Sequence, residues 1–226
     1  EQGGLKVVTT LNYPLQEKAE QIAAKYAKEN KEKFNASNNS IVAIDPKTGQ
    51  ILVMVGSKDY FNQEDQGNFN VALAHRQPGS SIKPFVYATA FKKGYSPDTV
   101  VFDVQTEFNP SCLDKYATNT PAVSSSSSSD KKDNCYMPEN YDHNYRGPVT
   151  LRDALAQSLN VPSVKTLYLA GIRASLDTMK DMGIDSLTDP DRYGLTLVLG
   201  GGEVSLLEMT GAYAVFANNG VRNPPV

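Results

Sequence analysis

The sequence predicts an α+β protein, because segments typical of strands come early in the chain and segments typical of helices come later. Two apolar runs, at 40–46 and 50–57, are joined by the turn sequence Asp45-Pro46-Lys47-Thr48-Gly49, as is typical of a β-hairpin. From residue 80 onward, helical segments bounded by Gly, Pro and Asn dominate. Strands and helices do not alternate, so a doubly wound parallel sheet is not favoured.

The N-terminal segment, residues 1–39, is expected to be a lead-in strand and helix that precedes the main domain at 40–226. Residues 5–11 alternate and carry valine and threonine, which predicts a strand. Residues 14–34 are rich in Ala, Glu, Lys and Gln, with apolar residues at helical spacing behind Pro14. We therefore expect one amphipathic helix over 14–34.

The main domain is expected to be mostly helical after residue 80. Residues 80–93 should form a helix with Pro84 in its first turn, because proline is not tolerated in a helix interior. Residues 95–110 look extended and irregular, and residues 112–145 look like a loop. Further helices are expected at 150–159 after a Thr150 cap, from Pro162 to about 170, at 173–182 before Gly183, and at 205–219 with Asn218-Asn219-Gly220 as a C-terminal stop.

Length and composition fit one globular domain with a sizeable core, or one domain with an entry segment. The chain has 226 residues, of which 40% are hydrophobic, and a formal net charge of −3. That charge argues against a nucleic-acid-binding protein, which usually carries a basic face. No apolar run approaches the ~18 residues of a membrane-spanning helix, and no signal peptide opens the chain.

Cys112 and Cys135 bracket a segment rich in Ser, Asn, Asp and Lys, with six consecutive serines at 124–129. Serine runs of this kind are usually flexible linkers. A disulfide that closes this insert, at about 112–135, would suit an extracytoplasmic protein, and it is the interpretation we favour. The alternative is two free thiols.

Only two histidines occur, His75 and His143. A Ser-His-Asp arrangement would need one of them close to the nucleophile. Both are interpreted as plain polar residues, since His75 precedes a turn and His143 lies in a loop rich in Tyr, Asn and Asp. No metal-ligand spacing is present, so we expect neither a metal nor a cofactor.

Ser80-Ser81-Ile82-Lys83 is the segment with the clearest chemical signature. On a helix, Ser80 and Lys83 lie at i and i+3 and face the same side. A lysine can take the proton of a serine hydroxyl if desolvation lowers the lysine pKa, which would make Ser80 a nucleophile. The helix N-terminus also favours developing negative charge. The alternative is an N-capping serine beside a solvated lysine.

Ser158-Leu159-Asn160 supplies a second element of the same signature, because S-x-x-K and Ser-x-Asn occur together in penicillin-binding proteins and class A β-lactamases. Arg76 to Tyr87 matches the active-site segment of class A penicillin-binding proteins almost letter for letter. Other matching segments are Gly4–Val7, Thr9–Leu11, Leu15-Gln16, Ile44–Gly49, Met54–Gly56, Val149–Arg152, Ala154–Ala156, Val161-Pro162, Gly200–Ser205, Glu208-Met209 and Ala212-Tyr213. The sequence thus resembles the transpeptidase domain of a class A penicillin-binding protein over nearly its whole length except about 112–135.

The resemblance implies a penicillin-binding-protein and serine β-lactamase-like transpeptidase fold, an antiparallel sheet flanked by helices plus a helical subdomain. It implies a peptidoglycan D,D-transpeptidase that cross-links stem peptides ending in D-Ala-D-Ala through an acyl-serine intermediate and is acylated by β-lactam antibiotics. Such an enzyme works outside the cytoplasm, at the cell membrane and cell wall. The anchor of the parent protein would lie in an N-terminal segment absent from this chain.

The resemblance also assigns roles to four residues. Ser80 would be the nucleophile; Ser81 is excluded because no lysine stands three residues after it. Lys83 would be the base for acylation, although the base is disputed in this superfamily. Ser158 would relay a proton between Lys83 and the leaving amine. Asn160 would hold the substrate amide, and its alternative role, compatible with the first, is a helix C-cap.

The third motif of the family, K-T-G, has no counterpart in the expected place. Lys47-Thr48-Gly49 spells it, but this segment precedes Ser80 and reads as a hairpin turn with Gly49 at positive φ. No K-T-G or K-S-G follows Asn160. Residues 40–226 are therefore expected to be an incomplete, N-terminal part of the domain, truncated before the K-T-G strand, which a downstream fragment would carry.

The same residues are compatible with other functions, and a truncated chain could also have no activity. A D,D-carboxypeptidase or a β-lactamase-type hydrolase uses the same residues and passes the acyl group to water, and a β-lactam sensor is acylated without turnover. Glu203 could serve as a deacylating base, but we interpret it as a structural hydrogen-bond acceptor. Gly200-Gly201-Gly202 before it are expected to let two elements pack closely.

Overall fold

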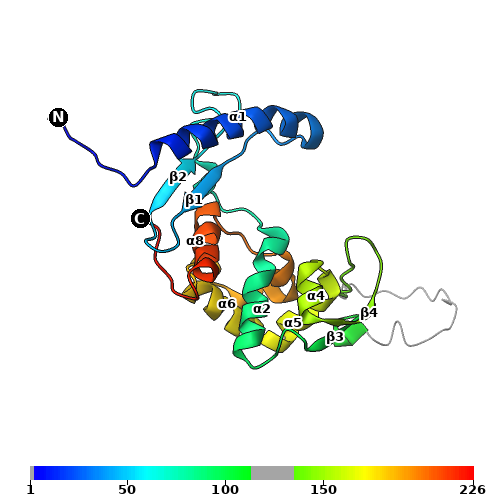
Figure 1. Ribbon diagram of the computed structural model, residues 1–226. Coiled ribbons are helices and arrows are strands. Elements are labelled where there is room, and N and C mark those ends of the chain that lie inside the picture. Colours follow the sequence, from blue (N-terminus) through cyan, green and yellow to red (C-terminus); the bar gives the residue numbers. More distant parts are fainter. Residues whose placement is uncertain (1–2, 113–134) are drawn as a thin grey trace.

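A computed structural model describes residues 3–112 and 135–226 of the chain. The serine run at 124–129 and most of the predicted insert fall outside the described residues. One end of the molecule is formed by helix α1 (Tyr13–Phe34), which lies along the hairpin of strands β1 (Ile41–Ile44) and β2 (Ile51–Val55) (Figure 1). The other end is mostly helical, and helix α8 (Leu206–Ala217) runs between the two ends and contacts β1.

The α1–hairpin end is held by a small apolar core. Strands β1 and β2 pair antiparallel, with Ile41 opposite Val55. Ala19 and Ala23 of α1 pack against Val53 and Val55. The expected helix at 14–34 and the expected hairpin are both confirmed.

The expected strand at 5–11 is wrong. These residues carry no strand pairing and are almost all exposed. The contacts of this stretch begin only at its end, where Thr10 Oγ1 donates to Ile51 O at 2.8 Å and Asn12 N donates to Leu52 O at 2.9 Å. Alternation of valine and threonine favours extended backbone, but a strand forms only where a partner strand lies alongside.

The helical end is built around α2 and α5, which pack against each other. Its elements are the 3-10 helix η2 (Gly79–Ile82), α2 (Lys83–Lys92), α4 (Leu151–Ala156), α5 (Asn160–Ala170), α6 (Ile172–Asp181), α7 (Pro190–Tyr193) and the 3-10 helix η4 (Gly194–Leu199). Helix α6 and the C-terminal stop of α8 match their expected positions, whereas α7 and η4 are not anticipated by the sequence pattern. One large core joins α2, α5, α6 and α8.

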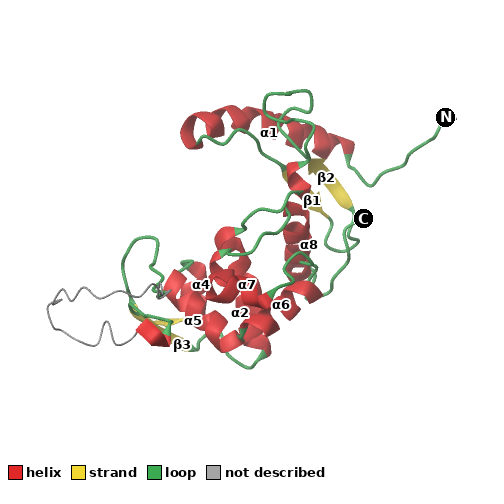
Figure 2. Cartoon of the chain, turned by 180° about the vertical axis from the view of Figure 1, so that it is seen from behind, coloured by secondary structure: helices red, strands yellow, loops and turns green. Residues whose placement is uncertain are grey.

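A second antiparallel ribbon lies at the far side of the helical end (Figure 2). It consists of β3 (Val100–Asp103) and β4 (Gly147–Thr150), with Asp103 opposite Gly147. Strand β3 falls in the segment 95–110 that was expected to be irregular, and β4 falls between the expected loop at 112–145 and the helix expected at 150–159, so neither strand was predicted. The α+β class is confirmed, with the described strands arranged as two two-stranded ribbons.

No helix among the described residues has the length and apolar character needed to cross a bilayer.

Candidate active site

Ser80 lies in η2, immediately before α2, and Lys83 is the first residue of α2. Lys83 N donates a hydrogen bond to Ser80 O, which closes the 3-10 turn between them. Side chains at i and i+3 of a 3-10 helix eclipse, so this turn directs Ser80 and Lys83 to one side. The expected helix at 80–93 is confirmed, with its first turn 3-10 rather than α.

The Lys83 side chain is completely buried (0% exposed) and surrounded by oxygen atoms. Its Nζ donates to Ser158 O at 2.7 Å, to Asn160 Oδ1 at 2.9 Å and to Ser158 Oγ at 3.2 Å. Leu159 O lies at 3.4 Å. Desolvation by burial lowers the Lys83 pKa from 10.5 to about 8. This lysine is therefore far easier to deprotonate than an exposed one.

Ser158 and Asn160 reach Lys83 from the connection between α4 and α5. Ser158 adopts a left-handed backbone conformation (φ 53°), which is uncommon for a residue with a Cβ. Asn160 is the first residue of α5 and its Nδ2 donates to Glu139 O at 2.9 Å. The alternative role of Asn160 as a helix C-cap is wrong, because α4 ends at Ala156 and Asn160 starts the next helix. Thr150 caps α4 as expected, by accepting from Asp153 N.

The structure brings Lys83, Ser158 and Asn160 into direct contact, but it does not link the Ser80 hydroxyl to them by a hydrogen bond. Ser80 is exposed, and its hydroxyl has no hydrogen-bond partner within residues 3–112 and 135–226. Catalytic hydrogen bonds are often long or poorly aligned before substrate binds and tighten only in the complex with substrate.

The turn that carries Ser80 is fixed by two close approaches. A Cβ on Gly200 would lie 2.4 Å from Gly79 N, so only glycine allows the two backbones to meet there. Tyr213 OH, in α8, donates to Ser81 O at 2.7 Å. The expectation that the triple-glycine segment allows close packing is thus confirmed at Gly200.

Glu203 is not the hydrogen-bond acceptor that the sequence suggested. It is exposed, and within the described residues its carboxylate forms an ion pair with Arg192 at 3.9 Å and no hydrogen bond. The glutamate that accepts structural hydrogen bonds here is Glu208, which forms a capping box with Ser205 at the start of α8. Because Glu208 stands three residues after a serine that opens a helix, the sequence pattern could have identified it.

Neither histidine hydrogen-bonds to Ser80, Lys83 or any other expected site residue. His143 Nδ1 lies 2.7 Å from Glu139 Oε2, and His75 Nε2 lies 3.9 Å from Glu208 Oε2.

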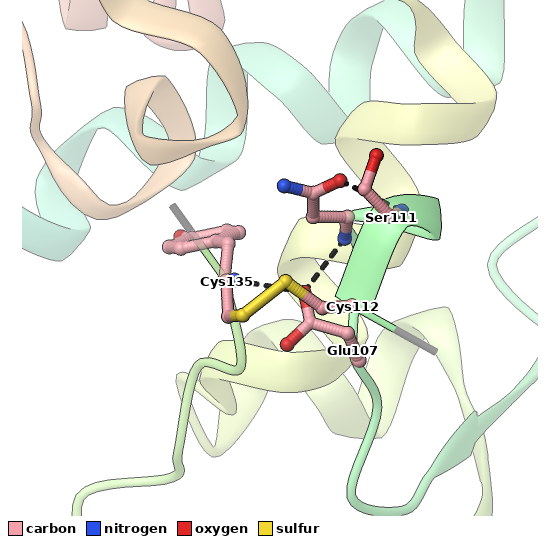
Figure 3. The surroundings of a disulfide bond; sticks show 6 residues. Glu107, Ser111, Cys112 and Cys135 are labelled. Carbon is pink, nitrogen blue, oxygen red and sulfur yellow. Dashed lines mark hydrogen bonds between the residues drawn. A yellow bond between two sulfur atoms is a disulfide. The ribbon is translucent and has the colours of Figure 1, made fainter. Parts of the chain in front are cut away.

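Cys112 and Cys135 form a disulfide, as favoured from the sequence (Figure 3). Glu107 lies beside both sulfur atoms, and these three residues are the one potential metal-ligand group in the described ranges. The disulfide occupies both sulfurs, so this group does not form a metal centre here.

Lys47-Thr48-Gly49 forms the hairpin turn between β1 and β2, as expected. Thr48 Oγ1 donates to Asp45 Oδ2 at 3.1 Å, and Gly49 has φ +78°. Lys47 and Thr48 are exposed. These contacts are those of a turn, and none reaches the Lys83 site.

Sequence reasoning missed one residue of the site's surroundings, the buried Asn140. It lies in a polar loop whose composition gave no sign of burial, and its side chain binds the backbone at Asn160. Only the tertiary contact reveals it.

Comparison with known proteins gives a consistent result. The family model described as the penicillin binding protein transpeptidase domain matches residues 39–137 and 123–226. Penicillin-binding protein 2D of Bacillus subtilis (strain 168) is 34% identical over 233 residues, covering 100% of this chain and 28% of that protein. The chain spans less than a third of the length of the curated relatives it matches.

Solved structures that resemble the chain include the following two. Penicillin-Binding Protein 1A from Haemophilus influenzae aligns with a TM-score of 0.63 and 30% identity, over 80% of this chain and 23% of that one. The PonA1 protein from Mycobacterium tuberculosis, solved in complex with penicillin V, aligns with a TM-score of 0.72 over 97% of this chain and 53% of that one. At 22% identity the second match establishes similarity of fold alone.

Proposed function

This chain belongs to the penicillin-binding protein transpeptidase family, and from that premise we propose that it performs serine-type acyl transfer on peptidoglycan stem peptides ending in D-Ala-D-Ala. Ser80 is the nucleophile and Lys83 is the base. The observation that carries the proposal is the fully buried lysine, held between Ser158 and Asn160 one turn after an exposed serine.

The contacts of Lys83 suit a base. The two shortest hydrogen bonds of its Nζ go to Ser158 O and Asn160 Oδ1, which are acceptors only. A neutral amine can keep both of these bonds and still direct its lone pair at a hydroxyl proton. The lowered pKa of Lys83 makes the neutral form accessible at physiological pH.

In the acylation step, Ser80 Oγ attacks the carbonyl carbon between the two D-alanines and its proton passes to Lys83. The C–N bond breaks, and the terminal D-Ala leaves with a proton that Ser158 relays from Lys83. The amine of a second stem peptide then attacks the acyl-Ser80 ester, which forms the cross-link and returns the proton to Ser80. Transfer to water instead of the amine would give the carboxypeptidase or β-lactamase-type outcome.

The backbone at Ser80 supplies one group for the oxyanion. Ser80 N has no hydrogen-bond acceptor within the described part of the chain and stands at the start of η2. An N–H group at that position can donate to the negatively charged oxygen that forms during acylation.

The partners and location proposed for the chain follow from the same chemistry. β-Lactams are proposed to acylate Ser80, and the penicillin V complex of the structurally similar PonA1 protein makes a penicillin the natural probe. The Cys112–Cys135 disulfide supports a location outside the cytoplasm, where disulfides persist.

The function is tested by incubating the full-length protein with a D-Ala-D-Ala stem peptide and an amine acceptor and analysing the products by mass spectrometry. Cross-linked product that disappears in Ser80→Ala and persists in the neighbouring Ser81→Ala supports transpeptidation. Trimmed peptide without cross-links would instead establish a hydrolase. If neither product forms, a parallel incubation with a penicillin that yields a covalent adduct would indicate a sensor.

A further inference from the structure

Asn140 is a buried asparagine (2% exposed) that joins the β3–β4 ribbon to the start of α5. Its Nδ2 donates to both carboxylate oxygens of Asp103, at 2.8 and 2.9 Å, and to Asn144 O at 2.8 Å. Its Oδ1 accepts from Asn160 N at 2.9 Å and from Val161 N at 3.3 Å. Both ends of the amide are therefore fully used.

These contacts fix the orientation of the Asn140 amide. Rotation by half a turn would place its oxygen against three acceptor oxygens, and its NH2 group against two N–H donors. Such an arrangement would lose all five hydrogen bonds, three of which are buried, and this is strongly unfavourable. The side chain therefore has one orientation.

Asp103 holds Asn140 from the ribbon side. It is completely buried at the end of β3, opposite Gly147 of β4. Arg146 N donates to its Oδ2 at 3.1 Å, and Arg146 Nη1 lies 3.8 Å from the same atom. The carboxylate thus has fixed partners on both sides and gives Asn140 a rigid anchor.

Helix α5 needs Asn140 because its own sequence provides no N-cap side chain. The N-cap residue is Leu159, which cannot accept the free N–H groups of the first turn. Asn140 Oδ1 takes this role from outside the helix, at Asn160 and Val161. The adjacent Glu139 O accepts from Asn160 Nδ2, which turns Asn160 Oδ1 toward Lys83 Nζ.

The segment leading to Asn140 is also tied down at its start. Cys135 is bonded to Cys112 (Figure 3). Tyr136 N donates to Glu107 Oε1 at 2.7 Å, and Phe108 N donates to Tyr136 O at 2.9 Å. Residues 135–140 are therefore held at both ends by the segment that contains and follows β3.

From this arrangement we infer that Asn140, anchored by Asp103, is a positioning residue for acylation: it sets the start of α5 and, through Asn160, the placement of Lys83. The inference rests on the proposed function of Ser80 and Lys83. Asn140 hydrogen-bonds to neither Ser80 nor Lys83, and its link to the lysine passes through Asn160.

The test exchanges the two side chains in the full-length protein and measures the limiting rate of Ser80 acylation by a penicillin. Asn140→Asp places a carboxylate against the buried carboxylate of Asp103 and removes its donors, so the rate should fall about 100-fold, as for a small misplacement of a catalytic group. Asp103→Asn combined with Asn140→Asp restores a donor facing an acceptor, and should recover at least about tenfold of that loss.

A matched control is Asn223→Asp, which also removes amide donors, in that case to Pro46 O at 3.0 Å and Lys47 O at 2.9 Å beside the hairpin turn. It should lower the melting temperature without slowing acylation. Rescue by the double variant is an effect that general destabilisation would not produce.

A second measurement does not depend on acylation. Asn140→Leu removes the acceptor for the Asn160 and Val161 amides, so hydrogen exchange at these two amides should accelerate more than in the rest of α5. Unchanged hydrogen exchange in Asn140→Leu would overturn this inference alone. The same holds if penicillin labels the wild-type protein and acylates Asn140→Asp at the same rate. An unlabelled wild-type protein would overturn the proposed function and the inference together.

Discussion

Two segments of this protein contain a lysine, a hydroxyl side chain and a nearby glycine, yet only one of them is chemically unusual. Lys47-Thr48-Gly49 is an exposed hairpin turn whose hydroxyl binds a carboxylate within the same turn. Lys83 is completely buried, with its Nζ directed at Ser158 and Asn160 from a distant part of the chain. The comparison shows that the reactivity of a motif lysine depends on its burial and its hydrogen-bond partners, and not on the residue types of the motif alone.

The buried lysine should be far more sensitive to substitution than the exposed one. Lys83→Met keeps an unbranched side chain but removes the proposed base, so acylation of Ser80 should slow by about 10² to 10⁴-fold. Lys47→Met should leave the rate unchanged. Stopped-flow measurement of penicillin acylation checks both variants, and equal rates for Lys83→Met and Lys47→Met would remove the distinction between the two segments.

The buried Lys83 should also give acylation and stability a characteristic pH dependence. Because burial lowers the Lys83 pKa to about 8, acylation should rise about tenfold per pH unit below that value and level off above it. The unfolded chain binds a proton more tightly than the folded one, so this lysine makes stability increase as pH rises from about 8 toward 10.5.

The control for this pH dependence is Lys83→Met, in which the increase in stability between these pH values should disappear. Denaturant unfolding at several pH values measures it. An increase that persists in Lys83→Met would assign it to another group.

The disulfide should matter to the Lys83 site and not to the hairpin. Replacing Cys112 and Cys135 by serine removes a cross-link between residues 23 apart in sequence and should cost about 2–4 kcal/mol of unfolding free energy. It should also slow acylation, since Cys135 starts the segment that carries Asn140. Denaturant unfolding and the acylation rate give the two readouts; a loss of stability with an unchanged rate would confine the disulfide to a stabilising role.

Two glycines offer a matched pair of smaller effect. A Cβ at Gly200 would lie 2.4 Å from Gly79 N, and a Cβ at Gly49 would lie 2.1 Å from Pro224 O. Both have positive φ, so Gly200→Ala and Gly49→Ala should each destabilise by about 1–3 kcal/mol. Only Gly200→Ala should also slow acylation, because Gly200 packs against Gly79, the residue directly before Ser80. Equal acylation rates in the two variants would refute this dependence of Ser80 on the Gly79–Gly200 contact.

The local elements could be predicted from the sequence because their signals are local. The helix at 14–34, the hairpin, the Thr150 cap and the helix after Ser80 each depend on periodicity, turn residues or a cap within a few positions. The strand expected at 5–11 failed because strand formation depends on a partner, and β3 was missed because its partner β4 lies more than 40 residues away.

The site was predictable to a similar extent and for a similar reason. The two motifs point to Ser80, Lys83, Ser158 and Asn160 as site residues through their spacing and the family resemblance. No sequence pattern predicts the hydrogen bond from Lys83 Nζ to Ser158 O. The role of Asn140 depends on a contact across 37 residues with Asp103, which only the fold creates. The burial of a polar residue in a loop cannot be predicted from the residues that flank it in the sequence.

The most direct test of the account is the intact mass of the protein after incubation with a penicillin, with Ser80→Ala and Lys83→Met alongside. The account predicts one adduct per wild-type chain, mapped by peptide analysis to Ser80, none in Ser80→Ala, and strongly delayed labelling in Lys83→Met. Equal labelling of all three proteins, or an adduct mapped to another residue, would contradict it.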